Sequence, residues 1–278
     1  MIDLHTHSTL SDGSDPPEAI AELANSAGCS AFALTDHDRM DGVPRARTRA
    51  RELGIRFISG CEVSCEWSPG TCHVLVYFVE PGDSPLSEEL RRLQDDRDTR
   101  NQRLIGRLND LGMAITLEEV EEEAGGGSIG RPHFASLMVT KGIVTNAQEA
   151  FDLYLGKGKP AYISKARITA REAAEHATAS GGVAVLAHPL SLGLSPADME
   201  GAVSELADAG LAGVEAYYGR YSPEERAGLV DMAHRHGLVA TGGSDHHGTF
   251  KPDLTVGKGT GDLEVPDSVV AELEGRRA

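Results

Sequence analysis

The chain has 278 residues, of which 40% are hydrophobic and 25% are charged, and its formal net charge is −17. This length allows one large α/β domain with a substantial core, or a barrel that carries an insertion. The acidic charge excludes a generic polyanion-binding surface, because sequence-independent nucleic-acid binding depends on Lys and Arg that neutralise phosphates. We expect no signal peptide, no membrane span and a cytoplasmic location.

Four cysteines lie in the first part of the chain, and Cys61 and Cys65 have a spacing that would suit zinc ligands. Three of the four stand in apolar, strand-like surroundings. Small buried thiols in a reducing cytoplasm are therefore favoured over a zinc cluster. The cysteines are Cys29, Cys61, Cys65 and Cys72.

Short apolar strands and amphipathic helices alternate in the first eighty or so residues. Gly28 and Gly54 are expected to end the first two helices, as glycine commonly does. The β/α/β/α/β order is typical of a parallel sheet. The expected elements are strands at 2–5, 31–35 and 56–59 and helices at 15–27 and 43–53.

The alternation stops after a fourth expected strand at 72–79. The next segments have helical patterns with no strand between them, which predicts an all-α insertion that acts as a cap. We assign 1–84 and 166–278 to a barrel domain and 85–165 to the insertion. The expected helices of the insertion are 86–111, 117–124, 133–141 and 147–155.

Strands and helices alternate again in the last part of the chain. Together with the earlier strands they predict an α/β fold in which about seven strands form a (β/α) barrel, slightly fewer than the usual eight. The expected elements are strands at 183–187, 213–216 and 238–241 and helices at 170–179, 196–209, 223–236 and 265–274.

Metal-competent side chains stand at or near the ends of these strands. His5 and His7 are two residues apart on extended backbone, so both imidazoles point to one side and can share a divalent metal. Barrel enzymes place their chemistry at the C-terminal ends of strands. His73 instead stands near the start of its strand. The other candidates, in order, are Asp36, His37, Asp38, Glu62, His188, Glu215, Asp245, His246 and His247.

Each candidate alone has an ordinary explanation, such as capping a helix or ending a loop. On one rim, however, these imidazoles and carboxylates would repel or desolvate one another unless a cation neutralised them. Mixed nitrogen and oxygen donors suit Mn, Fe or Zn ions. The set is also too large for a single ion.

Six short motifs resemble, in the same order, the motifs of the polymerase and histidinol phosphatase (PHP) family, and the resemblance spans the chain. It implies a distorted (β/α)7 barrel whose mouth holds a phosphoesterase centre of two or three metals. The motifs are Asp3-Leu4-His5-Thr6-His7-Ser8, Ser11-Asp12-Gly13, Thr35-Asp36-His37, Gly60-Cys61-Glu62, Ala187-His188-Pro189 and Gly243-Ser244-Asp245-His246-His247.

The resemblance also implies individual roles. The metals are expected to be manganese, with iron or zinc as alternatives, and Asp36 and Glu215 would orient imidazoles. Asp12 stands where some relatives have histidine. The implied ligands are His5, His7, Glu62 and Asp245 for the first metal, Glu62, His73 and His188 for the second, and Asp12, His37 and His247 for the third.

The insertion resembles the cap of the PHP subgroup that dephosphorylates nucleoside 3′,5′-bisphosphates and trims short RNA from its 5′ end. Arg131 offers forked donors that match phosphate oxygens, and His133 can add another; a surface ion pair is the ordinary alternative for Arg131. Lys157 and Lys159 flank glycines and either approach an anion or belong to a solvated loop. The matching residues are Gly130-Arg131-Pro132-His133-Phe134-Ala135, Ala150-Phe151 and 154–162.

These features together predict a phosphatase that removes the 3′-phosphate of nucleoside 3′,5′-bisphosphates by means of a metal-bound hydroxide, with His37, His247 or a water on the third metal assisting the leaving group. The alternatives are a 5′-3′ exonuclease on short oligonucleotides and a histidinol-phosphate phosphatase. A non-catalytic PHP scaffold or sensor module is the alternative from another class. The expected partners are a nucleotide and short RNA, with no membrane and no obligate protein partner.

Overall fold

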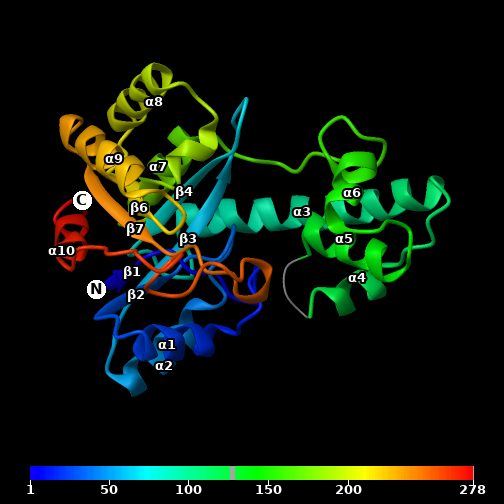
Figure 1. Ribbon diagram of the computed structural model, residues 1–278, viewed down its shortest axis with the longest axis horizontal. Helices are drawn as coiled ribbons and strands as arrows, with labels where there is room; N and C mark the ends of the chain where they lie inside the picture. Colours follow the sequence, from blue (N-terminus) through cyan, green and yellow to red (C-terminus); the bar gives the residue numbers. More distant parts are fainter. Residues whose placement is uncertain (126–128, 278) are drawn as a thin grey trace. The chain divides into compact units, whose positions relative to one another are not determined.

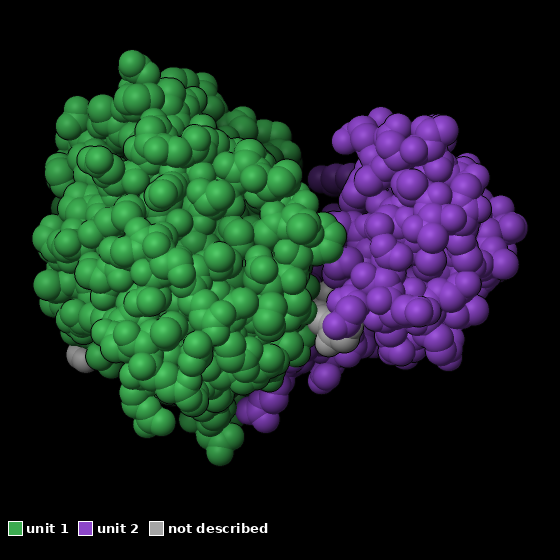
Figure 2. Space-filling model, turned by 60° about the horizontal axis from the view of Figure 1, so that its bottom comes forward, with its two compact units in different colours: residues 1–90, 167–278 green, residues 91–166 purple. Residues whose placement is uncertain are grey.

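The computed structural model describes residues 1–125 and 129–277. Two compact units make up the chain: unit 1 consists of Met1–Leu90 and Arg167–Ala278, and unit 2 of Arg91–Ala166 (Figure 2). None of the helices in the described ranges combines the length and the apolar character needed to cross a membrane. The cytoplasmic location stays a prediction, as does the role of residues 85–165 as a cap.

Unit 1 is built on a seven-stranded sheet in which the strands are neighbours in chain order (Figure 1). The first three strands are parallel to one another and so are the last three, whereas the fourth runs antiparallel to both of its neighbours. The strands are β1 (Ile2–Asp3), β2 (Ala31–Leu34), β3 (Arg56–Cys65), β4 (Cys72–Tyr77), β5 (Val183–Leu186), β6 (Gly213–Tyr218) and β7 (Val239–Gly243).

Backbone hydrogen bonds join the two ends of this sheet. The Leu4 amide donates to the Gly242 carbonyl at 3.2 Å, and the Asp245 amide donates to the His5 carbonyl at 2.8 Å. Thr6 also forms a parallel bridge with His246. The sheet is therefore a nearly closed barrel, and the predicted seven-stranded α/β barrel is confirmed.

The helices of unit 1 follow the barrel strands and bury their apolar faces. Thr169 and Glu172 form a capping box at the start of α7, and Ser222 and Glu225 do the same for α9. Gly54 ends α2 in the left-handed conformation that glycine adopts without strain. The helices are α1 (Pro17–Ser26), α2 (Val43–Leu53), α7 (Ala170–Ala179), α8 (Pro196–Asp208), α9 (Pro223–Arg235) and α10 (Ser268–Glu274).

The main departure from the predicted elements is in β3 and β4. Instead of ending at residue 59, β3 continues to Cys65 and pairs antiparallel with β4. Because β4 runs opposite to the other strands, it begins at the edge of the sheet where those strands end. His73, at the start of β4, therefore reaches the same rim as the C-terminal ends of the other strands, and Ser64 of β3 pairs with it.

Unit 2 is helical and has its own apolar core, which includes Leu108, Phe134, Met138 and Leu155. The long helix α3 begins in unit 1 and continues into unit 2. The helices are α3 (Pro85–Asp110), α4 (Leu117–Glu123), α5 (Arg131–Thr140), α6 (Ala147–Ala150) and the π-helix η1 (Phe151–Leu155).

All four cysteines are buried and none forms a disulfide. Cys65 and Cys72 face each other across β3 and β4. None of the candidate metal-ligand groups found among the described residues contains a cysteine. These observations agree with buried thiols rather than a zinc cluster.

Candidate metal centre

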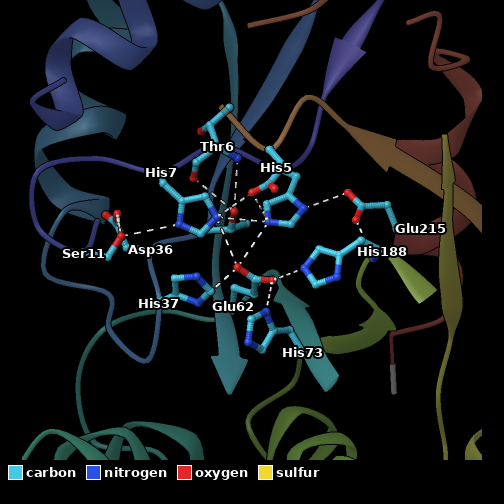
Figure 3. A network of polar contacts seen from close by, with 12 residues as sticks. His5, Thr6, His7, Ser11, Asp36, His37, Glu62, His73, His188 and Glu215 are labelled. Atoms are coloured by element: carbon cyan, nitrogen blue, oxygen red, sulfur yellow. Dashed lines mark hydrogen bonds and ion pairs between the residues drawn. The ribbon is translucent and has the colours of Figure 1, made fainter. Parts of the chain in front are cut away.

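The predicted metal ligands gather at one rim of the barrel in unit 1, where several imidazoles surround the carboxylate of Glu62 (Figure 3). Their positions in the sequence are far apart, and the closed sheet brings them together. His5 and His7 follow β1, Asp12 lies between β1 and α1, His37 follows β2, Glu62 lies in β3, His73 lies in β4, His188 follows β5, and Asp245 and His247 follow β7.

Four donor atoms form the first group. The Nε2 atoms of His5 and His7 are 3.1 Å apart, and Glu62 Oε2 lies 3.3 and 3.2 Å from them. Asp245 Oδ1 lies 3.4 Å from both nitrogens. Ligands that are each about 2.1 Å from one metal lie about 3.0–3.4 Å from one another in octahedral or tetrahedral geometry. Glu62 Oε2 and Asp245 Oδ1 therefore each have the spacing of co-ligands to both imidazole nitrogens.

The other oxygen of Glu62 faces a second group. Glu62 Oε1 lies 2.9 Å from His188 Nε2 and 2.9 Å from His73 Nδ1. The carboxylate is buried, and each of its oxygens contacts a different set of imidazoles. This is the arrangement expected of a ligand that bridges two ions.

A third group contains Asp12, His37 and His247, together with His7. Asp12 Oδ1 lies 3.3 Å from His247 Nε2, and Asp12 Oδ2 lies 3.7 Å from His37 Nε2. His37 also presents Nδ1 to Glu62 Oε2 at 3.1 Å. His7 and His37 thus lie between groups, which makes the three candidate positions one continuous cluster.

Two buried donor atoms in this cluster, Asp12 Oδ1 and His37 Nδ1, make no hydrogen bond to any residue in the described ranges. Asp12 Oδ1 lies 3.3 Å from His247 Nε2, and His37 Nδ1 lies 3.1 Å from Glu62 Oε2, but neither contact has the geometry of a hydrogen bond. Buried polar atoms in proteins almost always have a partner. Atoms that converge on a common point without bonding to one another fit divalent cations.

In the metal-free chain, protons on the imidazoles of His5 and His7 balance the negative charge of the carboxylates in the first group. Burial lowers the pKa of His5, but the carboxylates of Glu215, Glu62 and Asp245 outweigh burial and raise this pKa well above its ordinary value. Burial also lowers the pKa of His7, yet hydrogen bonds with Asp245 and Glu62 raise it to about 9. A divalent ion would replace these protons as the counter-charge.

His37 and His247 behave differently. Burial lowers the pKa of His37 to about 3 although Glu62 lies beside it, and burial and the nearby His7 lower the pKa of His247. Both imidazoles are therefore neutral near pH 7 and have a lone pair to offer a metal. These pKa directions favour a ligand role for His37 and His247 over the predicted role in assisting the leaving group, which stays a prediction.

Glu215 orients the ring of His5 by a hydrogen bond to Nδ1, the ring nitrogen that faces away from the cluster. His5 Nδ1 donates to Glu215 Oε1 at 2.8 Å, and the His188 amide donates to Glu215 Oε2 at 2.8 Å. His247 is held in a similar way, because its Nδ1 donates to the Asp245 carbonyl at 2.8 Å. Such partners leave Nε2 of each ring facing the cluster. The contact of Glu215 agrees with its predicted orienting role.

Asp36 contacts serines rather than an imidazole. It accepts hydrogen bonds from the amide and hydroxyl of Ser8, both at 2.7 Å, and from the Ser11 hydroxyl at 2.6 Å. Ser11 Oγ in turn lies 3.5 Å from His7 Nδ1. Asp36 therefore stabilises the loop that carries Asp12 instead of orienting a ring directly.

Ser191 orients His188 and was not among the predicted residues. The Ser191 hydroxyl donates to the Thr71 carbonyl at 3.0 Å, so its oxygen accepts from His188 Nδ1 at 2.9 Å. Nε2 of His188 then faces Glu62 Oε1 at 2.9 Å. The spacing of three residues between His188 and Ser191 is visible in the sequence, but the contact with Thr71 depends on the β3–β4 hairpin.

The predicted substrate-binding residues all lie in unit 2. The guanidinium of Arg131 lies 5.3 Å from the ring centroid of Tyr162 and 5.9 Å from that of Phe151. Its Nη1 donates to the Leu155 carbonyl at 3.1 Å. Two aromatic rings and a carbonyl therefore fix the plane of this partly buried guanidinium.

His133 is buried, and its Nδ1 accepts a hydrogen bond from the Gly130 amide at 3.1 Å, which caps the start of α5. Lys157 and Lys159 are exposed in the turn after η1. Substrate binding by these three residues and Arg131 stays a prediction.

Comparison with known proteins gives a consistent result. The model of the PHP domain matches residues 3–107. The 3′,5′-nucleoside bisphosphate phosphatase of Chromobacterium violaceum is 32% identical over 99% of this chain and 97% of that protein. The 5′-3′ exoribonuclease Rnm of Escherichia coli is 32% identical over 89% of this chain and 85% of that protein. A crystal structure of a predicted metal-dependent phosphoesterase from Bifidobacterium adolescentis is 28% identical, with a TM-score of 0.85 over 100% of this chain and 96% of that chain.

Proposed function

Because the chain belongs to the PHP family and is a phosphoesterase, we propose that it removes the 3′-phosphate from nucleoside 3′,5′-bisphosphates in the cytoplasm. Adenosine 3′,5′-bisphosphate would give AMP and phosphate. The observation that carries the proposal is the Glu62 carboxylate, whose two oxygens face two separate groups of imidazoles. That geometry suits a phosphate ester held between two cations.

The rim would hold two or three divalent ions, with manganese as the first choice and iron or zinc as alternatives. When bound, such ions lower the pKa of a water molecule and neutralise charge on phosphoryl oxygens. Glu62 would be shared by the two main positions through its two oxygens, while Glu215 and Ser191 keep the rings of His5 and His188 turned toward it. The buried carboxylates lie in a low-dielectric setting, where their interaction with cations is strong.

Arg131 would hold the second phosphate, the one that does not react. A guanidinium whose plane is already fixed can donate two parallel hydrogen bonds to a phosphate with little loss of entropy. His133, whose Nδ1 accepts from the Gly130 amide, would add its Nε2 as a further donor. Lys157 and Lys159 would add positive charge. This local set explains how a chain of net charge −17 could select a doubly phosphorylated nucleotide.

A second candidate function is removal of nucleotides from the 5′ end of short RNA, which the similarity to the exoribonuclease Rnm favours. The same rim would cut the phosphodiester. The substrate of a histidinol-phosphate phosphatase carries only one phosphate, so it has no second phosphate for Arg131 to bind. The convergence of all predicted ligands argues against a non-catalytic module.

A panel of substrates tests the proposal. The manganese-loaded enzyme is supplied with adenosine 3′,5′-bisphosphate, adenosine 3′- and 5′-monophosphates, histidinol phosphate and a 5′-phosphorylated oligoribonucleotide, and released phosphate and nucleotides are measured. We expect the bisphosphate to have the highest kcat/KM. Preference for histidinol phosphate, or no phosphate release from any compound, would refute the proposal. Preference for the oligoribonucleotide would support the second candidate instead.

A further inference from the structure

The two oxygens of Asp245 have different partners. Oδ1 lies 3.4 Å from His5 Nε2 and His7 Nε2, in the first group of donors. Oδ2 accepts a hydrogen bond from the Tyr218 hydroxyl at 2.7 Å and another from Lys251 Nζ at 2.6 Å. One oxygen is thus turned toward the candidate metal position, and the other is held by two donors of the protein.

Tyr218 reaches Asp245 because β6 contains a bulge. In a regular strand, residues three apart point to opposite faces, so Glu215 and Tyr218 would not share the rim. The pairing with β7 shifts between Glu215 and Tyr217, which leaves Ala216 as the extra residue. Glu215 can therefore hold His5 while Tyr218 holds Asp245.

The aromatic ring of Tyr218 has a separate contact. It packs edge-on against the imidazole of His188, with 5.5 Å between the ring centroids. Its hydroxyl, at the far end of the side chain, donates to Asp245 Oδ2 at 2.7 Å. The hydroxyl and the ring thus support ligands of two different donor groups.

Lys251 adds a charge-assisted contact to the same oxygen. Its side chain is 29% exposed, whereas that of Asp245 is 3% exposed. The terminal torsion of an aspartate side chain is broad and nearly two-fold, so contacts decide which oxygen faces a given direction. With Tyr218 and Lys251 on Oδ2, a rotated carboxylate would lose two hydrogen bonds in a buried place.

We propose that Tyr218 and Lys251 are positioning residues that hold Oδ2 of Asp245 and thereby direct Oδ1 toward the first metal. The inference rests on the proposed metal-dependent function. Loss of a contact that orients a metal ligand typically lowers metal affinity about 10- to 100-fold. Neither side chain was predicted as a site residue, because a bulge and a loop contact bring them to the rim.

Tyr218→Phe is the most specific variant, because it removes the hydroxyl and keeps the ring against His188. Tyr217→Phe is the matched control, since it removes a hydroxyl from the neighbouring residue, which points to the other face of β6. Metal-free proteins are titrated with Mn²⁺ in competition with a fluorescent chelator. We expect Tyr218→Phe to weaken the affinity of one manganese position about 10- to 100-fold, and Tyr217→Phe to leave it unchanged.

Lys251 is tested in the same titration. Lys251→Met should weaken manganese binding, and Lys251→Arg should restore part of the affinity because it keeps a charged donor. Excess Mn²⁺ should return kcat of Tyr218→Phe and Lys251→Met toward the wild-type value, which general damage to the fold would not allow. Circular dichroism of the metal-free proteins checks folding, and the Lys251 pair decides the question if Tyr218→Phe does not fold.

The outcomes separate the two ideas. Wild-type affinity for Mn²⁺ in both Tyr218→Phe and Lys251→Met would overturn the positioning roles and leave the proposed reaction intact. A wild-type enzyme that binds Mn²⁺ but releases no phosphate from any phosphomonoester would overturn the proposed reaction. The titration would then still decide the positioning roles.

Discussion

The rim of unit 1 and the surroundings of Arg131 in unit 2 are assembled in different ways. At the rim, contacts join residues that are distant in sequence: His188 contacts Glu62, 126 residues away in the chain, and His5 contacts Glu215, 210 residues away. Arg131 contacts a carbonyl only 24 residues away. The rim therefore depends on closure of the whole barrel, whereas the Arg131 region depends on local helices and turns. We infer that changes at the rim affect every substrate and that changes near Arg131 affect selection.

The largest effect is expected for Glu62→Gln, which removes the charge shared by the two main donor groups. Loss of one such charge-stabilising group lowers kcat by about 10²- to 10³-fold. The loss should be the same for monophosphates and bisphosphates in a phosphate-release assay. Glu66→Gln is a matched control, because Glu66 is exposed just beyond the same strand and should be silent. A loss confined to bisphosphates would contradict the assignment of chemistry to the rim.

Metal removal is expected to destabilise unit 1. Ions that bind only the folded state add about 2.7 kcal/mol to the free energy of unfolding at a concentration about 100 times their Kd. Trp67, the one tryptophan of the chain, lies in the β3–β4 hairpin and donates to the Leu192 carbonyl at 3.2 Å, so its fluorescence reports on unit 1. Chelation should lower the melting temperature that Trp67 reports, and added Mn²⁺ should restore it. An unchanged melting temperature would speak against metal at the rim.

Arg131→Ala is expected to change substrate preference. Hydrogen bonds from a charged donor contribute about 1.5–3 kcal/mol, so kcat/KM for adenosine 3′,5′-bisphosphate should fall about 10- to 100-fold while that for the 3′-monophosphate stays nearly constant. Arg131→Lys should recover only part of the loss, because lysine lacks the planar fork. Arg103→Ala, at an exposed arginine of α3, serves as the control. Equal losses on both substrates would show that Arg131 does not select the second phosphate.

The smallest effect is expected for Glu200, a carboxylate of unit 1 outside the rim. Hydrogen bonds from Arg235 and His236 lower its pKa from 4.5 to about 2. A lowered folded-state pKa means that this group contributes stability above pH 4.5 and loses it as the pH falls toward 2. The contribution is small because the group is exposed. Urea unfolding of metal-free wild type and Glu200→Gln should differ slightly at pH 7 and converge as the pH falls to about 2, with kcat unchanged. A difference that grows toward low pH would contradict this assignment.

Much of the fold could be predicted because its signals are local. Periodicity predicted α2 and α7 with their observed bounds, and Gly54 ends α2 as expected. The histidine pair after β1 was found because alternation on extended backbone directs His5 and His7 to one side, and their Nε2 atoms do lie 3.1 Å apart.

The features that were missed depend on pairing between strands. Periodicity does not reveal strand direction, so the antiparallel course of β4 and its effect on His73 were not predicted. The bulge that turns Tyr218 to the rim is likewise a property of β6 and β7 together. Ser191 lies in a single 3₁₀ turn and Lys251 directly follows another, and the sequence pattern specifies neither of these short segments.

The products formed from adenosine 3′,5′-bisphosphate test most directly whether the rim cuts the 3′-phosphate. The manganese-loaded enzyme is incubated with this substrate, and the nucleotides are separated by chromatography while phosphate is quantified. We predict AMP that retains its 5′-phosphate, together with an equal amount of phosphate, at a rate about 10²- to 10³-fold lower in Glu62→Gln, and neither product from chelated enzyme. Adenosine 3′-phosphate as the product, or phosphate release at the wild-type rate in Glu62→Gln, would contradict the proposed function.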